Sequence, residues 1–171
     1  ATALTMSGCF SGDPDLTVEV CGDVNVPEEV DAIRVIVFDD ERNSEAASGS
    51  KDLLTCPDAT VTSLPLDIDI AAVPEDAWVV MEGLKDGVAV VTFERRLRGG
   101  GDSEVRAVMG LTRDCLGINC PLGQTCYGGA CQVVEFDSGN SVCKSTMVVE
   151  PLLPSTEPLC ADDGGFEPGD V

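Results

Sequence analysis

Cysteines are the residues of this chain whose type and number point most directly to chemistry. The sequence has nine Cys and no His among its 171 residues. Structural zinc sites and thiol oxidoreductases both use CxxC pairs, and the sequence contains none. The cysteines therefore indicate disulfide bridges, which persist in oxidising compartments. The count predicts an extracellular or outer cell-surface location.

Cys9 differs from the other eight cysteines. Residues 1–10, ATALTMSGCF, are small and apolar, and Met6-Ser7-Gly8-Cys9 looks like the end of a bacterial lipoprotein signal. In that interpretation Cys9 carries a lipid, which would be the membrane contact of the protein. In the alternative, residues 1–14 stay as an extended arm and Cys9 is available to a neighbouring subunit. Eight disulfide candidates remain: Cys21, Cys56, Cys115, Cys120, Cys126, Cys131, Cys143 and Cys160.

The pairing of these eight cysteines does not follow from their number. We expect Cys21 to pair with Cys56 inside the main domain and Cys143 to pair with Cys160. We expect interleaved pairs in the segment 115–131. Each bridge should contribute about 2 to 4 kcal/mol to stability.

Acidic residues are the second group with possible chemistry. There are 31 Asp and Glu against 10 Lys and Arg, a formal charge of −21, which disfavours nucleic acid as a partner. Asp67 and Asp69 are expected on the solvated face of a strand rather than as a glycosidase pair. Calcium is the one cofactor we consider, without EF-hand spacing. Its weak candidates are Asp13, Asp15, Asp162 and Asp163, with Asp39, Asp40 and Glu41 as further oxygen ligands.

Other catalytic machinery is not favoured. Without His the imidazole-based triads are excluded, and Gly99-Gly100-Gly101 falls at a predicted hairpin tip rather than in a phosphate-binding loop. We expect a protein that is not an enzyme. Arg95, Arg96 and Arg98 form a basic cluster in an acidic chain. They are candidates for contact with an acidic patch on a partner, with a solvated loop as the alternative.

The elements that must hold these residues are predicted to be strands. Short β-branched runs alternate with turn residues over 15–112, which predicts an antiparallel β-sandwich of the immunoglobulin-like or transthyretin-like kind. Lys85-Asp86-Gly87 predicts a tight hairpin. We expect a surface loop over 39–50. The expected strands cover 16–20, 32–38, 52–56, 60–70, 77–84, 88–97 and 104–111.

After the sandwich the composition changes. The segment 113–171 is Cys-rich with an acidic tail and has too few apolar residues for a core of its own. Its passage CLGINCPLGQTCYGGACQ resembles the C-x4-C-x5-C-x4-C knots of secreted proteins and lipoproteins from myxobacteria, where the knot often follows a sandwich domain. The resemblance implies a style of surface protein and no particular activity.

Two functions are expected from these observations. The first is an extracellular structural protein, a surface or filament subunit that associates with itself or with another surface protein. The second is a lipid-anchored lipoprotein that binds a protein or glycan ligand. The first uses residues 1–14 as an arm that a neighbouring sandwich accepts as an extra strand.

Overall fold

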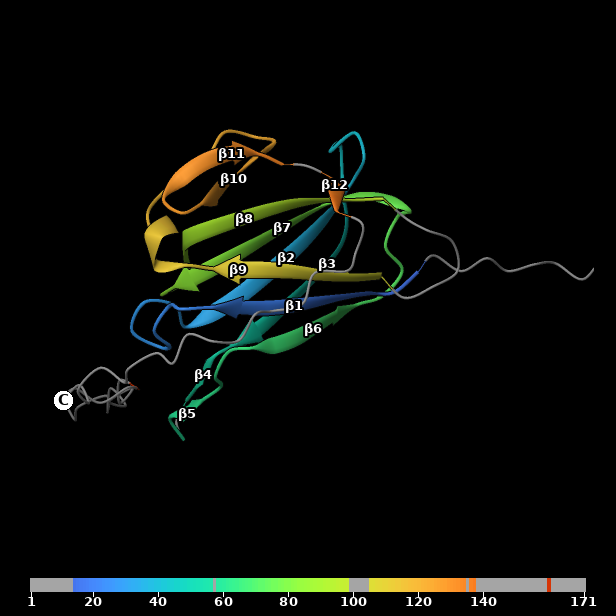
Figure 1. Cartoon of the computed structure of the whole chain (residues 1–171). Helices are drawn as coiled ribbons and strands as arrows, with labels where there is room; N and C mark the ends of the chain where they lie inside the picture. Colours follow the sequence, from blue (N-terminus) through green and yellow to red (C-terminus); the bar gives the residue numbers. More distant parts are fainter. Residues whose placement is uncertain (1–13, 57, 99–104, 135, 138–159, 161–171) are drawn as a thin grey trace, which may run out of the picture.

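The chain folds as a set of packed β-sheets (Figure 1). The structure is a computed structural model, and it describes residues 14–56, 58–98, 105–134, 136–137 and 160. Within these residues no helix is long and apolar enough to cross a membrane. The elements are β1 (Leu16–Gly22), β2 (Ala32–Asp39), β3 (Glu45–Asp52), β4 (Leu54–Thr55), β5 (Thr60–Val61), β6 (Leu66–Ile70), β7 (Asp76–Lys85), β8 (Val88–Arg98), β9 (Val105–Leu111), the 3-10 helix η1 (Arg113–Cys115), β10 (Gln124–Tyr127), β11 (Ala130–Val133) and β12 (Phe136–Asp137).

Two sheets form the body of the molecule. A three-stranded sheet has the order β6-β1-β9, and a five-stranded sheet has the order β12-β8-β7-β2-β3. Alternate side chains of β1, β2 and β7 are buried between them, because successive residues of a strand point to opposite faces. The core is aliphatic, as the low aromatic content predicts. The mainly β sandwich is confirmed.

The β7–β8 hairpin is also confirmed. Strand β7 pairs with β8 from Asp76 opposite Arg98 to Lys85 opposite Val88. The two residues of the turn, Asp86 and Gly87, have φ values of 51° and 75°. Asp and Gly tolerate positive φ better than most residues, which is why this dipeptide sets the turn.

Strand β3 corrects the expected surface loop over 39–50. Residues 45–52 instead pair antiparallel with β2. The small residues that lower strand propensity here also allow close packing on β6. A Cβ added at Gly49 would lie 3.2 Å from the Ile68 side chain and 3.3 Å from that of Ile70.

Strand β9 corrects a second expectation. It was predicted to return beside β8, but it pairs in parallel with β1, from Leu16 opposite Val105 to Gly22 opposite Leu111. The sandwich is therefore not purely antiparallel. Residues 99–104, with the expected hairpin tip Gly99-Gly100-Gly101, lie outside the described residues.

The expected strand 60–70 is divided in two. Strand β5 pairs with β4, and β6 pairs antiparallel with β1. The alternation within β6 is as predicted, because Ile68 and Ile70 are buried and Asp67 and Asp69 are exposed. Strand β6 is an edge of its sheet and begins directly after Pro65.

Three disulfides are described, and they correct two expected pairings. Cys56 bonds Cys160, 104 residues away, so neither Cys21–Cys56 nor Cys143–Cys160 forms. The physical reason is that tertiary structure, not sequence proximity, determines which cysteines meet. Interleaved pairing is confirmed in the segment 115–131, where Cys115 bonds Cys126 and Cys120 bonds Cys131. Cys21 is also in a disulfide. Cys9 and Cys143 lie outside the described residues.

Candidate interaction surface

The outer face of the five-stranded sheet carries a mixed apolar and charged surface. Three rows of cross-strand neighbours, each with one residue from β2, β7 and β8, lie on this face. The middle of the face is apolar and half-buried, with Ile36 and Phe38 on β2 beside Val80 and Trp78 on β7. The rows are Phe38, Trp78 and Arg96; Ile36, Val80 and Glu94; and Arg34, Glu82 and Thr92.

The turn between β2 and β3 packs against the side chain of Trp78. The guanidinium carbon of Arg42 lies 3.6 Å from the centroid of the Trp78 ring, a cation–π contact. The Trp78 Nε1 donates to the backbone oxygen of Asp40 at 3.2 Å. Arg96 donates to the Asp40 carboxylate, with its Nε 3.1 Å from Oδ1. These contacts hold residues 40–42 against the sheet.

Glu94 joins the same turn to the Cys-rich hairpin. Its carboxylate is buried and accepts from Arg42 Nη2 at 2.7 Å and from the backbone N–H of Gly123 at 3.2 Å. The backbone N–H of Glu94 donates to Thr125 Oγ1 at 3.1 Å. Both partners of the Arg42–Glu94 pair are largely withdrawn from water, with side-chain exposures of 12% and 9%.

Arg42 is only partly satisfied in this position. Its Nε and Nη1 atoms are buried and have no hydrogen-bond partner. Unpaired buried donors cost free energy, which the ring of Trp78 and the carboxylate of Glu94 offset. Arg42 also has a φ of 58°, uncommon for a residue with a side chain. Arg42 therefore has a structural role, because it connects the β2–β3 turn to Trp78 on β7 and Glu94 on β8.

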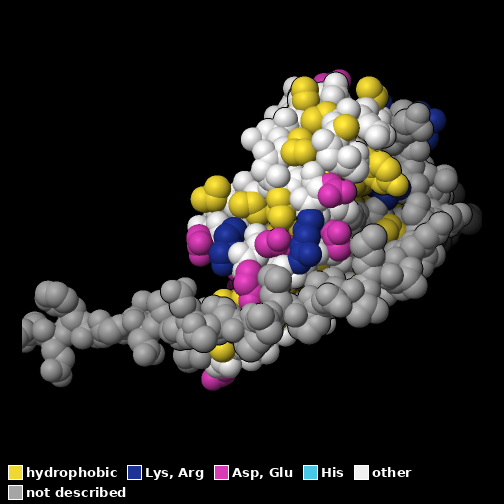
Figure 2. Space-filling model, turned by 60° about the vertical axis from the view of Figure 1, so that its left-hand side comes forward, with side chains coloured by type: hydrophobic (Ala, Val, Ile, Leu, Met, Phe, Trp, Pro, Cys, Tyr) yellow, Lys and Arg dark blue, Asp and Glu magenta, His cyan; other side chains and the backbone are white. Residues whose placement is uncertain are grey.

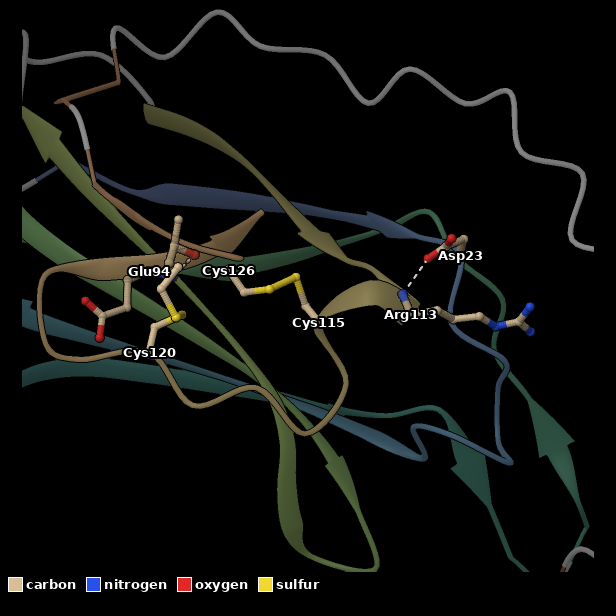
Figure 3. Close-up of a disulfide and its surroundings, with 8 residues drawn as sticks. Asp23, Glu94, Arg113, Cys115, Cys120 and Cys126 are labelled. Carbon is tan, nitrogen blue, oxygen red and sulfur yellow. Dashed lines mark hydrogen bonds between the residues drawn. A yellow bond between two sulfur atoms is a disulfide. The ribbon is translucent and has the colours of Figure 1, made fainter. Parts of the chain in front are cut away.

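The β10–β11 hairpin is stapled onto the sandwich. The Cys115–Cys126 bridge joins η1 to β10, and Cys120 and Glu94 lie near its Cys126 end (Figure 3). The backbone N–H of Arg113 donates to the Asp23 carboxylate at 2.8 Å. Cys115 and Cys126 belong to the main hydrophobic core. The described part of the Cys-rich segment therefore shares the core of the sandwich.

Apolar side chains are exposed on this hairpin and just before it. Leu122, Tyr127 and Val133 are 77%, 69% and 73% exposed. Figure 2 shows apolar side chains in the upper part of the molecule, at the height of the hairpin in Figure 1, and basic and acidic side chains side by side below them. The β10–β11 register places Tyr127 and Val133 on opposite faces of the hairpin, so the three exposed side chains do not form one patch.

The outer face of the three-stranded sheet is polar. Arg106 on β9 bonds Glu19 on β1 at 2.9 Å and Asp67 on β6 at 3.1 Å. The pKa of Arg106 is raised, chiefly by the hydrogen bond to Glu19 and, to a smaller degree, by the charge of Asp67. Thr17 donates to Asp69 at 2.7 Å. Asp67 and Asp69 thus bond neighbouring strands, in agreement with the predicted solvated sheet face.

The three arginines expected to form one cluster point in different directions. Arg95 lies opposite Val79, in the core-facing row, and donates to the backbone oxygen of Val108 on β9. Arg96 lies opposite Trp78 on the outer face and pairs with Asp40. Arg98 is exposed at the end of β8. Because adjacent residues of a strand face opposite ways, Arg95 is separated from Arg96 and Arg98, which share the outer face of β8.

The expected calcium ligands are only partly placed. Asp13, Asp162 and Asp163 lie outside the described residues. The Asp15 carboxylate accepts from the backbone N–H of Ala72 at 3.2 Å, and Asp39 accepts from Asn43 and Ser44 within the β2–β3 turn. No group of three or more acidic or Cys side chains in the described part of the chain could hold a metal ion.

The edge of the five-stranded sheet is the feature that sequence reasoning missed. Strand β3 is the last strand of the sheet beside β2. Its residues 46–50 are uncharged and include no Pro. The polar, small-residue composition of EAASGSKD gives no alternating pattern. The absence of Pro and of central charges was the one available signal.

Comparisons of the chain with family models, curated proteins and solved structures give no match in any of the three.

Proposed function

We propose that the protein is an extracellular structural component that self-associates, as a subunit of a surface layer or filament. The observation that carries this proposal is the edge of β3, which pairs with β2 and with no further strand among the described residues, on a disulfide-stapled sandwich. A sheet edge presents unpaired backbone N–H and C=O groups, which can accept a strand from another molecule. Multiple disulfides are typical of proteins in an oxidising extracellular environment, and they stabilise a subunit against unfolding there.

The negative charge of the chain opposes self-association. Copies with a formal charge of −21 repel one another, and salt screens exposed charges over about 10 Å at 0.1 M ionic strength. Self-association should therefore strengthen as salt or divalent cation is added. Repulsion between the acidic chains then limits self-association until ions in the external medium screen the charges.

Light scattering and electron microscopy of the oxidised chain test the proposal. We expect a single low-mass species in low salt and larger assemblies at high salt or with calcium. Magnesium at equal ionic strength separates screening from a calcium-specific effect. A monomer under every condition, over a wide range of concentration, would refute the proposal.

The lipid-anchored binding module is the second candidate function. The observation in its favour is the exposure of Tyr127 and Val133 on the β10–β11 hairpin and of Leu122 just before it, since exposed aromatic and aliphatic side chains suit a protein or glycan ligand. Mass spectrometry of the chain isolated from its native membrane tests the anchor. A diacylglyceryl group on Cys9 supports this candidate, and a Cys9 that carries no lipid refutes it.

A further inference from the structure

We infer that the two interleaved disulfides of the Cys-rich hairpin form a thiol-exchange site. A low-molecular-weight thiol opens the Cys120–Cys131 bridge, and the Cys131 thiolate then displaces Cys115 from Cys126. The product is a Cys126–Cys131 bridge within the hairpin, so the covalent tie between η1 and β10 is lost. Such an exchange does not depend on self-association of the chain.

Cys126 and Cys131 are directly opposite each other in the β10–β11 hairpin. The backbone N–H of Val134 donates to the oxygen of Gly123 at 3.0 Å, which makes these two residues a hydrogen-bonded pair. Hydrogen-bonded and non-hydrogen-bonded pairs alternate along an antiparallel ladder, so Cys126 and Cys131 form a non-hydrogen-bonded pair. The Cα atoms of such a pair are about 4.5 Å apart, with both side chains on one face. Disulfides span Cα distances of about 4.4 to 6.8 Å, so a direct Cys126–Cys131 bridge fits the existing register.

The two bridges differ in their access to solvent. Cys115 and Cys126 are 2% and 3% exposed and belong to the core, whereas Cys131 is exposed and Cys120 is half-buried. A dissolved thiol therefore reaches the Cys120–Cys131 bridge first, because exchange requires access to a sulfur. Figure 3 shows Cys120, the bonding partner of Cys131, near the Cys126 end of the buried bridge. The buried bridge is then opened by a neighbouring sulfur rather than by the solvent.

The exchange has two steps. In the first, two molecules of the thiol are oxidised to their disulfide, and Cys120 and Cys131 are reduced to thiols. In the second, the Cys131 thiolate attacks Cys126 Sγ, and the bond between Cys126 and Cys131 forms as the bond between Cys126 and Cys115 breaks. The electron pair leaves on Cys115 Sγ, which takes up from solvent the proton that Cys131 released. The second step involves no net oxidation or reduction.

The Cys56–Cys160 bridge provides the comparison. Cys56 is also exposed, so the same thiol reaches it. Cys56 directly follows β4, and no cysteine lies opposite another in the β4–β5 pairing. Reduction of this bridge should therefore give two thiols and no new bridge.

Partial reduction of the wild-type chain tests the exchange. The oxidised chain is treated with reduced glutathione for increasing times, alkylated with N-ethylmaleimide and mapped by mass spectrometry without further reduction. We expect alkylated Cys115 and Cys120 together with a Cys126–Cys131 bridge, and alkylated Cys56 and Cys160 at the comparison bridge. If Cys120 and Cys131 are alkylated while Cys115–Cys126 stays intact at every time, the inference is wrong.

Three serine variants separate the roles of the sulfurs. Cys120→Ser leaves the Cys131 thiol opposite Cys126, so we expect a Cys126–Cys131 bridge without added thiol. Cys131→Ser leaves only the Cys120 thiol, which has no place opposite Cys126 in the hairpin, so the Cys115–Cys126 bridge should remain. In the double variant, glutathione should open Cys115–Cys126 at least about tenfold more slowly than in the wild type, because the intramolecular attack is lost.

Equal opening rates in the wild type and the double variant would overturn the inference, as would the same bridge pattern in both single variants. Circular dichroism checks that each variant folds. The wild-type mapping decides the question if a single variant does not fold.

Discussion

The buried pair between Arg42 and Glu94 should be a main contact between the sandwich and the Cys-rich hairpin. Glu94→Ala removes the acceptor of Arg42 and of the Gly123 N–H together. It leaves a guanidinium that is only 12% exposed and already has two unpaired nitrogens. Breaking a buried ion pair from one side costs about 3 to 5 kcal/mol, and we expect a loss of unfolding free energy in this range.

A double-mutant cycle isolates the pair. Arg42→Ala should cost a similar amount, and the double variant should cost much less than the sum, with a coupling of about 2 kcal/mol. Glu94→Gln keeps an oxygen for the Gly123 N–H and should cost less than Glu94→Ala. Trp78 is the single Trp of the chain. Its emission reports unfolding by urea under oxidising conditions, with circular dichroism as a second probe because Arg42 touches its ring.

The Arg34–Glu82 pair provides the matched control. It crosses β2 and β7 on the same outer face, but its side chains are 50% and 17% exposed. Solvent-exposed pairs contribute about 0 to 1 kcal/mol, so Arg34→Ala should have a small effect. The reasoning is refuted if the two pairs cost the same, or if the coupling between Arg42 and Glu94 is within about 0.5 kcal/mol of zero.

Three further predictions concern stability, each measured as the free energy of urea unfolding of the oxidised protein. Gly22→Ala would place a Cβ 1.9 Å from a backbone oxygen of β9, so we expect a loss of about 3 kcal/mol or failure to fold. In the control variant Gly110→Ala the added Cβ meets nothing within 4 Å, so stability should change by less than about 0.5 kcal/mol. Equal losses in the two variants would contradict the close approach of β1 and β9 at Gly22. Gly87→Ala, at a φ of 75°, should cost about 1 kcal/mol, and an unchanged midpoint would contradict the turn conformation. Replacing Cys115 and Cys126 together by Ser opens a bridge between residues 11 apart and should cost about 3 kcal/mol, whereas peptide mapping that finds these cysteines in other pairs would contradict the connectivity.

Local patterns predicted the parts of the fold that local chemistry determines. The alternation in β1, β2 and β6 and the Asp86-Gly87 turn each encode their own conformation within a few residues. Strand β3 could not be predicted in this way. It is extended because β2 offers a hydrogen-bonding partner and because Gly49 allows close packing on Ile68 and Ile70. Neither cause lies within residues 45–52.

Long-range contacts account for the rest of the differences. The choice of β1 as the partner of β9, and of Cys160 as the partner of Cys56, depends on how the sheets pack. The Arg42–Glu94 pair joins residues 52 positions apart in the sequence. Composition identifies the acidic, basic and cysteine residues, but it could not indicate that Arg95 and Arg96 would face opposite sides of β8.

The parallel pairing of β1 with β9 has a consequence for the order of synthesis. Strand β1 is the central strand of its sheet, and its partners begin only at Leu66 and Val105. A chain made from its N-terminal end therefore carries the apolar residues of β1 unpaired until most of the sandwich has emerged. Closing so distant a contact is slow compared with forming the β7–β8 hairpin. A nascent chain that ends before β9 leaves β1 with a bare edge, so its strand partners are incomplete until late in synthesis.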